Sequence, residues 1–156
     1  MSRNDPLISV ILVTMRPSYL PGVHAMMARQ NYANTELVVA LHGYKASDLL
    51  PIEKQALNGA DVVLEIPKER SLGHCLNEAI AASHGAFVAK IDDDDLYGKF
   101  YLAEAAQHLL AGDGDIVGKA ENYAFLEASH AIILRRPGAG LKPAKYLAGS
   151  SLAFSR

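Results

Sequence analysis

Short, β-branched apolar runs alternate with segments of helical periodicity along the first 119 residues of the chain. The runs predict buried strands at residues 7–14, 34–43, 61–67, 86–91 and 115–119. A helical segment follows each of the first four runs, and this alternation is typical of a parallel sheet joined by right-handed crossovers. We therefore predict an α/β protein of one domain, residues 1–156, with a mostly parallel central sheet and helices on both faces.

The predicted helices carry their own boundary signals. Ser71 is the expected N-cap of the third helix, and Gly85 is its expected stop. Pro51 falls inside the second helical segment and is expected to break it. The fourth helix is expected to begin near Lys99.

The helical rhythm stops after residue 119. Residues 121–129 and 130–138 predict two antiparallel strands around a short turn, and residues 144–156 end in another strand-like run. Exposed strands of this kind can pair with another copy of the chain, so a homodimer is one expected assembly.

Composition narrows the class of protein. The net charge of −2 is not the basic surplus that phosphate backbones require, so nucleic acid is not an expected partner. The single cysteine, Cys75, excludes an internal disulfide. No stretch approaches the roughly 20 apolar residues of a membrane span, and the first residues do not form a signal peptide. The expected location is the cytoplasm, with the cytoplasmic face of a membrane left open.

Four consecutive aspartates, Asp92 to Asp95, directly follow the strand predicted at residues 86–91. Ligands of open α/β sheets bind outside the carboxyl ends of the strands. Two charges about 4 Å apart repel by roughly 1 kcal/mol in water and about 4 kcal/mol near a protein surface. If the backbone stays extended, Asp92 and Asp94 project to one side and form a hard oxygen site for Mg²⁺ or Mn²⁺. A divalent cation would offset the repulsion; the alternative is an acidic turn that caps a helix.

The segment SLGHCLNEAIAASHGAFVAKIDDDDLY, together with ISVILVT and ELVVALHG upstream, resembles the inverting glycosyltransferases of family 2. The resemblance runs from about Leu7 to Arg156. It implies the GT-A fold, a Rossmann-like arrangement with a small antiparallel C-terminal part.

The resemblance also implies roles for the aspartates. Asp92 and Asp94 match the family's DxD pair, with Asp94 as the direct metal ligand and Asp92 at the ribose or the metal's waters. Asp93 joins the nucleotide-sugar-binding set, and Asp95 joins the metal shell or orients the following turn. The implied cofactor is Mn²⁺ or Mg²⁺.

Other positions match segments that line the family's nucleotide pocket. Thr14 and Arg16 lie where the family contacts the nucleotide base, Arg70 is suited to a diphosphate, and Gly149 lies on the acceptor side. The remaining matched positions are Lys68, Leu72, Gly73 and Asn77.

Two departures from the family pattern stand out. His42 occupies a position where a carboxylate commonly grips the nucleoside, so it either contacts the nucleoside or is a structural loop residue. The family's general base, an Asp or Glu, would fall beyond Arg156, so the resemblance implies a domain that is incomplete at its C-terminus and has no assigned catalytic residue.

The implied activity is metal-dependent transfer of a sugar, with inversion, as in a hexosyltransferase of polysaccharide biosynthesis. The donor would be a nucleotide-diphosphate sugar, with a UDP-sugar as the first candidate, and the acceptor a saccharide or other hydroxyl compound. Two alternatives are a non-catalytic nucleotide-binding or interaction module and a Mg²⁺-dependent phosphohydrolase of the haloacid dehalogenase type. The latter usually carries its aspartates on the first strand.

Overall fold

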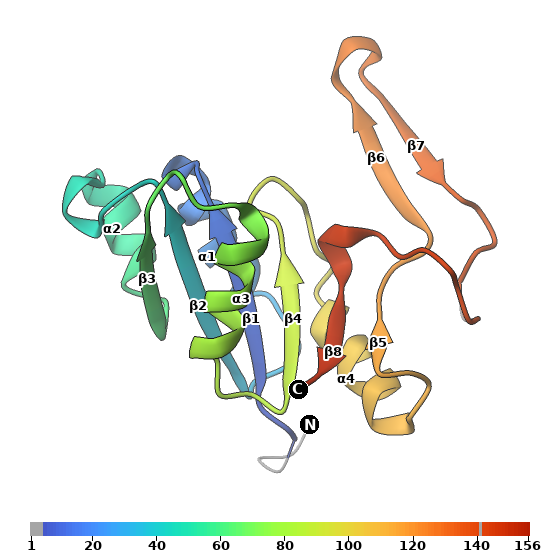
Figure 1. The fold of residues 1–156 in the computed structure, drawn as a ribbon. Helices are drawn as coiled ribbons and strands as arrows, with labels where there is room; N and C mark the ends of the chain where they lie inside the picture. The colour runs from blue at the N-terminus through green and yellow to red at the C-terminus, as the bar shows by residue number, and fades with distance from the viewer. Residues whose placement is uncertain (1–4, 141) are drawn as a thin grey trace.

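The computed structural model describes residues 5–140 and 142–156. The central sheet has six strands: β1 (Ile8–Thr14), β2 (Thr35–His42), β3 (Val62–Ile66), β4 (Phe87–Ile91), β5 (Ile116–Val117) and β8 (Ala153–Ser155). The helices are α1 (Leu20–Met27), α2 (Pro51–Leu57), α3 (Leu72–Ala82) and α4 (Tyr101–Ala111). Short 3-10 turns are η1 (Pro17–Tyr19), η2 (Ala46–Asp48), η3 (Glu127–Ser129) and η4 (Gly149–Ser151), and β6 (Asn122–Leu126) with β7 (Ala131–Arg135) forms a separate hairpin (Figure 1).

The order of the strands reverses at the middle of the sheet. The strands lie in the order β3-β2-β1-β4-β8-β5, and β1 pairs in parallel with both β2 and β4. The chain therefore builds outward from β1 to β3 and then returns to the other side of β1 to form β4. This makes a topological switch point between β1 and β4, where open α/β sheets form their ligand crevice.

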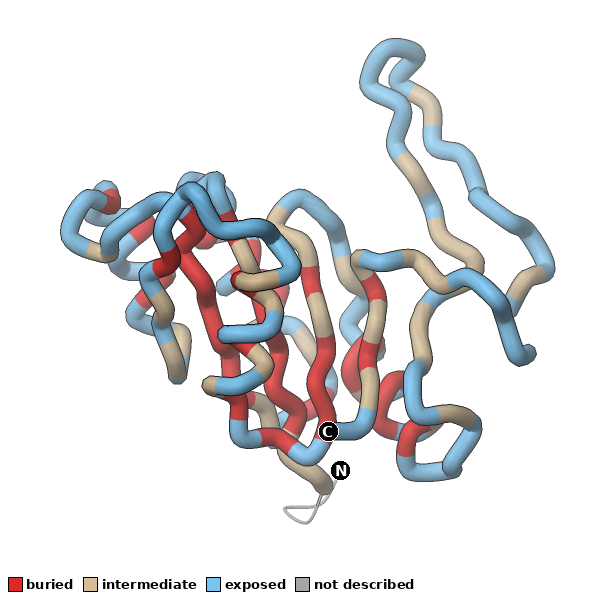
Figure 2. The backbone as a smooth tube through the Cα atoms, in the orientation of Figure 1, coloured by how far each residue is buried: buried red, intermediate tan, exposed pale blue. Residues whose placement is uncertain are grey.

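Helices cover both faces of the sheet, as the strand–helix alternation predicted. Val10 and Leu12 of β1 pack in the cluster that includes side chains of α1, α2 and α4, whereas Ile11 packs with Ala79 of α3. The central strands are consequently buried on both sides (Figure 2), which explains why their sequences are continuous apolar runs. Among the helices of residues 5–140 and 142–156, none is both long and apolar enough to cross a bilayer.

The helix boundaries agree with the sequence in part. Ser71 caps α3, because its Oγ accepts a hydrogen bond of 3.2 Å from the His74 backbone N–H. Gly85 does not end this helix, which stops at Ala82; a Cβ at position 85 would instead lie 2.6 Å from the Ser9 backbone nitrogen. The prediction for Gly85 was wrong because its small size serves a close approach of two chain segments, not a helix end.

The break predicted at Pro51 is confirmed, because Leu49 and Leu50 are extended between η2 and α2. Pro51 then begins α2, at the helix position where the missing N–H of proline costs least. The fourth helix, α4, begins at Tyr101, and Lys99 lies in the turn before it.

The C-terminal part of the sheet differs from the prediction. The strand predicted at residues 115–119 is only two residues long and lies at the sheet edge. β8 inserts between β4 and β5 and runs antiparallel to both. Ile116 of β5 is 58% exposed, so little apolar burial stabilises a longer strand there.

The hairpin of β6 and β7 confirms the predicted antiparallel pair and projects away from the sheet (Figure 1). Its register places Tyr123 opposite Leu134 and Phe125 opposite Ile132. These four side chains share one face of the hairpin, since neighbours on a strand alternate sides. The face is apolar, and all four of its residues are exposed. The predicted homodimer stays a prediction.

Candidate functional site

The four aspartates lie where the parallel strands of the sheet end. β1, β2, β3 and β4 run in the same direction, so their last residues, Thr14, His42, Ile66 and Ile91, lie toward one edge. Asp92–Asp95 directly follow β4, next to the switch point between β1 and β4. The predicted location at a carboxyl edge is therefore confirmed, although the roles of the aspartates stay a prediction.

Asp93, in the loop after β4, bonds two residues at the end of β1 and in the loop that follows it. Leu12 of β1 pairs with Ile91, the last residue of β4. Two residues after each of these, the Thr14 hydroxyl donates to Asp93 Oδ2 at 2.5 Å. The Arg16 guanidinium also bonds the Asp93 carboxylate, and the Arg16 backbone N–H donates to Thr14 Oγ1 at 2.9 Å. The Asp93 side chain is only 5% exposed. Its carboxylate is thus engaged by the protein itself.

Two cations of the chain offset the repulsion among the aspartates. Arg16 Nη2 lies 2.9 Å from Asp94 Oδ2 in addition to its contact with Asp93, and Lys90 pairs with Asp92. Hydrogen bonds to Asp93 and then to Asp94 raise the pKa of Arg16 above its ordinary value. A divalent cation was predicted to offset this repulsion, but an arginine and a lysine of the chain already offset much of it.

The aspartate loop could take part in binding a metal without forming a closed cage. The backbone turns at Asp93 and Asp94, so the alternation expected of an extended segment does not apply. The side chains of Asp94 and Asp92 are 49% and 38% exposed, and Asp95 is exposed. In the part of the chain that the structure describes, no three His, Cys, Asp or Glu side chains gather as a metal site. A divalent ion here would need waters or substrate oxygens to complete its shell.

The residues assigned to the nucleotide pocket surround the N-terminal half of α3. Arg70, Gly73 and Asn77 are exposed, and so is Leu72, at 54%. A Cβ at Gly73 would meet no atom within 4 Å, so the backbone at the first turn of α3 is open to approach. Because α3 follows β3, this turn faces the same edge of the sheet as the aspartates. Backbone N–H groups at the start of a helix and guanidinium groups such as that of Arg70 are both suited to phosphate oxygens.

His42 lies at the end of β2 but is not free to contact a ligand. Its residue is only 6% exposed, and its Nε2–H donates to the Lys68 carbonyl oxygen at 3.2 Å. The next residue, Gly43, has a φ of +83°, and its N–H donates to the Ile66 carbonyl at 2.7 Å. These contacts favour the interpretation of His42 as a structural loop residue. A nucleoside contact would require its bond to Lys68 to break.

Gly149 opens η4, which lies beside the aspartate loop. The Tyr97 hydroxyl donates to the carbonyl of Ser150 at 2.5 Å and accepts from the Asp92 backbone N–H at 2.9 Å. Tyr97 and Lys90 were not predicted as members of this site. The position of Tyr97, two residues after the acidic run, is a signal that could have indicated it. Lys90 lies inside a strand, and no sequence pattern marks it as a site residue.

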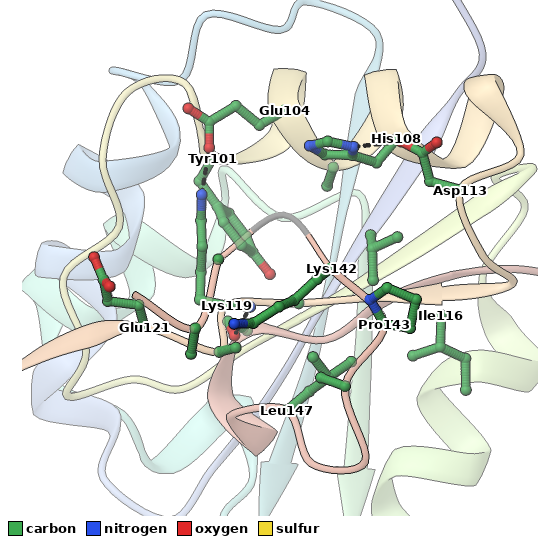
Figure 3. Close-up of a pocket in the computed structure, with 18 residues that line it drawn as sticks. Tyr101, Glu104, His108, Asp113, Ile116, Lys119, Glu121, Lys142, Pro143 and Leu147 are labelled. Carbon is green, nitrogen blue, oxygen red and sulfur yellow. Dashed lines mark hydrogen bonds and ion pairs between the residues drawn. The ribbon is translucent and has the colours of Figure 1, made fainter. Parts of the chain in front are cut away.

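A cavity of about 710 Å³ lies elsewhere, between α4, β5 and the segment before η4 (Figure 3). Among the described residues that line it, none is a predicted site residue. Several of its charged groups are paired with each other: Lys119 bonds Glu104, and His108 Nδ1 lies 2.7 Å from Asp113. It adjoins η4 through Ser151, so it neighbours the candidate site without being part of it.

Comparisons with known proteins add information on the fold. No protein-family model matches the chain, and no curated protein matches it. The mannosyltransferase PcManGT from Pyrobaculum calidifontis, solved with GDP-Man and Mn²⁺, matches 99% of this chain and 46% of its own with a TM-score of 0.70 and 18% identity. S. aureus TarS 1–349, solved with UDP-GlcNAc, matches 71% of this chain and 33% of its own with a TM-score of 0.56 and 24% identity.

This chain therefore spans less than half the length of either neighbour. At these identities the likeness establishes the fold alone. The chain has the mixed α/β fold of solved glycosyltransferases, which is the architecture that its strand–helix alternation predicted.

Proposed function

We propose that the chain binds the nucleotide-diphosphate sugar donor of a metal-dependent glycosyltransferase that transfers a hexose to an acceptor hydroxyl with inversion. One observation carries the proposal: a four-aspartate loop lies at the switch point of a fold whose solved examples hold GDP-Man or UDP-GlcNAc. Switch points at carboxyl edges are where such folds bind ligands.

The donor set suits a hard divalent cation. Carboxylate oxygens are the ligands that Mg²⁺ and Mn²⁺ prefer, and Asp94 and Asp92 present partly exposed carboxylates on the loop. In this proposal Asp94 ligates the metal directly, Asp92 contacts the ribose or the metal's waters, and Asp95 completes or orients the loop. The bound metal would supply Lewis-acid stabilisation of the charge on the leaving nucleotide. PcManGT was solved with Mn²⁺, which supports this choice of cofactor.

The cations of the chain bind the phosphates. Arg70 and the open first turn of α3 at Gly73 receive diphosphate oxygens, since a guanidinium and free backbone N–H groups both donate to them. Arg16, half-exposed and held by Asp94, turns toward the nucleotide when the donor arrives. Thr14 keeps its bond to the buried Asp93 and so holds the β1 loop in place. Asn77, one turn further along α3, contacts the nucleotide.

The loop after β2 does not indicate which base the donor carries. His42 is bonded to Lys68 and does not provide the carboxylate that would grip a nucleoside. The neighbours were solved with donors that carry different bases, GDP-Man in PcManGT and UDP-GlcNAc in TarS. We propose a UDP-sugar as the first donor to test, with a GDP-sugar as the second.

The acceptor approaches from the side of Gly149. Its hydroxyl attacks the anomeric carbon on the face opposite the nucleotide, which gives inversion. We assign the general base to none of residues 1–156. A phosphohydrolase of the haloacid dehalogenase type is disfavoured, because its aspartates lie on the first strand whereas these follow β4.

The test is a calorimetric titration of UDP, and then of GDP, into the folded protein with Mn²⁺ and with EDTA. Asp94→Asn removes the proposed ligand charge while keeping the shape of the side chain. Asp115→Asn is the matched control, because it changes an exposed aspartate that precedes β5 at the opposite edge of the sheet.

We expect binding that requires Mn²⁺, is lost in Asp94→Asn and is retained in Asp115→Asn. A nucleotide affinity that is unchanged both by EDTA and by Asp94→Asn would favour the non-catalytic nucleotide-binding module instead. A folded wild-type protein that binds neither nucleotide would overturn the proposed function.

A further inference from the structure

The hydroxyl of Tyr97 joins two loops that the proposed reaction needs together. It accepts a hydrogen bond of 2.9 Å from the Asp92 backbone N–H and donates one of 2.5 Å to the Ser150 carbonyl. Asp92 begins the aspartate loop, and Ser150 lies in η4 directly after Gly149. One oxygen atom thus connects the metal side of the proposed site to its acceptor side.

The ring of Tyr97 is held independently of this hydroxyl. It packs against Tyr101 of α4 with ring centroids 4.8 Å apart and planes tilted by 49°. Tyr101 is buried, and its own hydroxyl donates to the Lys90 carbonyl over a longer 3.3 Å.

The Asp92 backbone N–H is bonded by the Tyr97 side chain and not by a neighbouring strand. The β4–β8 ladder pairs Phe87 through Ala89, and the Lys90 N–H still donates to the Leu152 carbonyl at 2.8 Å. Ile91 pairs with Leu12 of β1, and the Asp92 N–H, at the start of the aspartate loop, is bonded to Tyr97. The Tyr97 hydroxyl therefore holds the start of the aspartate loop against η4, while Thr14 and Arg16 hold Asp93 further along it.

We propose that Tyr97 is a positioning residue that sets the aspartate loop against η4 and so tunes metal-dependent donor binding. The inference rests on the proposed function. It requires Tyr97 to act through Asp92 and Ser150, without touching the donor or the metal. Partners that orient metal ligands from outside the coordination shell typically change metal affinity by about 10–100-fold when removed.

The test compares Tyr97→Phe with Tyr101→Phe. The first removes the bridging hydroxyl and keeps the stacked ring; the second removes a hydroxyl from the other ring of the same pair and leaves the bridge intact. Calorimetry measures UDP and GDP binding in Mn²⁺ and in EDTA, and the Mn²⁺ electron paramagnetic resonance signal measures metal binding with and without nucleotide. Circular dichroism and thermal melting establish that both variants are folded.

We expect Tyr97→Phe to weaken Mn²⁺-dependent nucleotide binding by about tenfold and to leave any binding in EDTA unchanged. The nucleotide affinity of Tyr101→Phe should stay close to that of wild type. Equal affinity in Tyr97→Phe and wild type would overturn the inference and leave the proposed function standing. An equal loss in Mn²⁺ and in EDTA would also overturn it, because the hydroxyl would then act on the whole fold. A wild-type protein without metal-dependent nucleotide binding would remove the proposed function, and this inference with it.

A second measurement, hydrogen exchange, uses the wild-type protein and needs no variant. In the wild-type protein the Asp92 amide should exchange its hydrogen slowly, because Tyr97 holds it. Exchange at the rate of an unprotected loop amide would show that the bond is absent and would overturn the inference by itself.

Discussion

The guanidinium of Arg16 reaches from the loop after β1 to Asp94, with Nη2 2.9 Å from Oδ2, while it also bonds the buried Asp93. The chain thus carries its own counter-ion for the aspartate loop. Any divalent cation that binds Asp94 has to approach this positive charge or displace it. Arg16 therefore opposes metal binding until a negatively charged donor gives it another partner.

Arg16→Gln should consequently bind Mn²⁺ more tightly than wild type when no nucleotide is present. Two unit charges of the same sign about 4 Å apart repel by roughly 1 kcal/mol even in water, so removal of the Arg16 charge beside a bound cation should raise the Mn²⁺ affinity about fivefold. A Mn²⁺ titration followed by electron paramagnetic resonance at fixed ionic strength measures the change.

Lys54→Gln is the control for net charge, because Lys54 is an exposed lysine in α2 whose ammonium donates to the Ser47 carbonyl. It should leave Mn²⁺ affinity unchanged. Mn²⁺ affinity in Arg16→Gln at or below the wild-type value would contradict the counter-ion role of Arg16.

Gly73→Ala should separate donor binding from stability. Gly73 of α3 and Gly22 of α1 both lie in helices with open space around an added Cβ. Alanine stabilises such positions by about 0.5–1 kcal/mol. At Gly73, however, the methyl group stands where a phosphate would approach the first turn of α3, so nucleotide affinity should fall by about 1 kcal/mol or more.

Gly22→Ala provides the comparison for this experiment, since it should raise the melting temperature and leave nucleotide affinity unchanged. Calorimetry with UDP or GDP in Mn²⁺ and thermal melting are run on both variants. If Gly73→Ala binds nucleotide as tightly as wild type, the diphosphate does not approach α3 at this turn.

The centre of the fold could be predicted from the sequence because its strands are buried on both faces. Such strands must be continuous apolar runs, and the runs at β1, β2 and β4 are easily recognised. Once the strands are parallel, their carboxyl ends lie at one edge, which places Asp92–Asp95 at the same edge of the sheet as the loop after Thr14. This step needed only strand direction, and no knowledge of side-chain contacts.

The detailed contacts could not be predicted, because they join residues far apart in the chain. Arg16 and Asp93 are 77 residues apart, and Tyr97 and Ser150 are 53 residues apart. No local pattern specifies either pair. The insertion of β8 between β4 and β5 was missed for the same reason, since a three-residue strand has too little sequence to indicate its neighbours.

Glu36 organises the opposite, amino-terminal edge of the sheet. The residue is 8% exposed and accepts hydrogen bonds from the Ser9 hydroxyl, the His84 N–H at 2.5 Å and the Gly85 N–H at 3.2 Å. Glu36→Gln keeps the shape but turns one acceptor into a donor that faces other donors. It should lower the free energy of unfolding by about 2 kcal/mol, measured by urea denaturation.

The pH dependence of stability should change in the same variant. Burial alone would raise the pKa of Glu36, but the hydrogen bonds from Ser9, His84 and Gly85 outweigh it and lower the pKa below its ordinary value. A lowered pKa contributes stability above the unfolded value of about 4.3 and loses it as the pH falls through the folded pKa. Wild type should therefore lose stability more steeply than Glu36→Gln below about pH 4.3.

His84→Ala tests whether the backbone donors carry this effect. It removes the ring nitrogen that lies 3.0 Å from Glu36 Oε2 and keeps the His84 and Gly85 N–H groups. The steep acid dependence should persist in His84→Ala. Parallel stability curves for wild type and Glu36→Gln would show that the Glu36 carboxylate is not specially stabilised in the folded protein.

Gly85→Ala should be one of the more destabilising single-methyl changes in the chain. Its Cβ would lie 2.6 Å from the Ser9 nitrogen and 2.7 Å from the Leu7 carbonyl oxygen, and these backbone atoms belong to the start of β1 and the segment before it. Relief of the clash must move the α3–β4 connection away from β1, which also stretches the bonds that Gly85 N–H makes to Ser9 and Glu36. Overpacking of this kind costs about 1–3 kcal/mol, measured by urea denaturation, whereas Gly22→Ala changes stability in the opposite direction. A Gly85→Ala protein as stable as wild type would mean that the connection is free to shift, and that β1 and β4 are not held together at this edge by the Ser9–Glu36–Gly85 contacts.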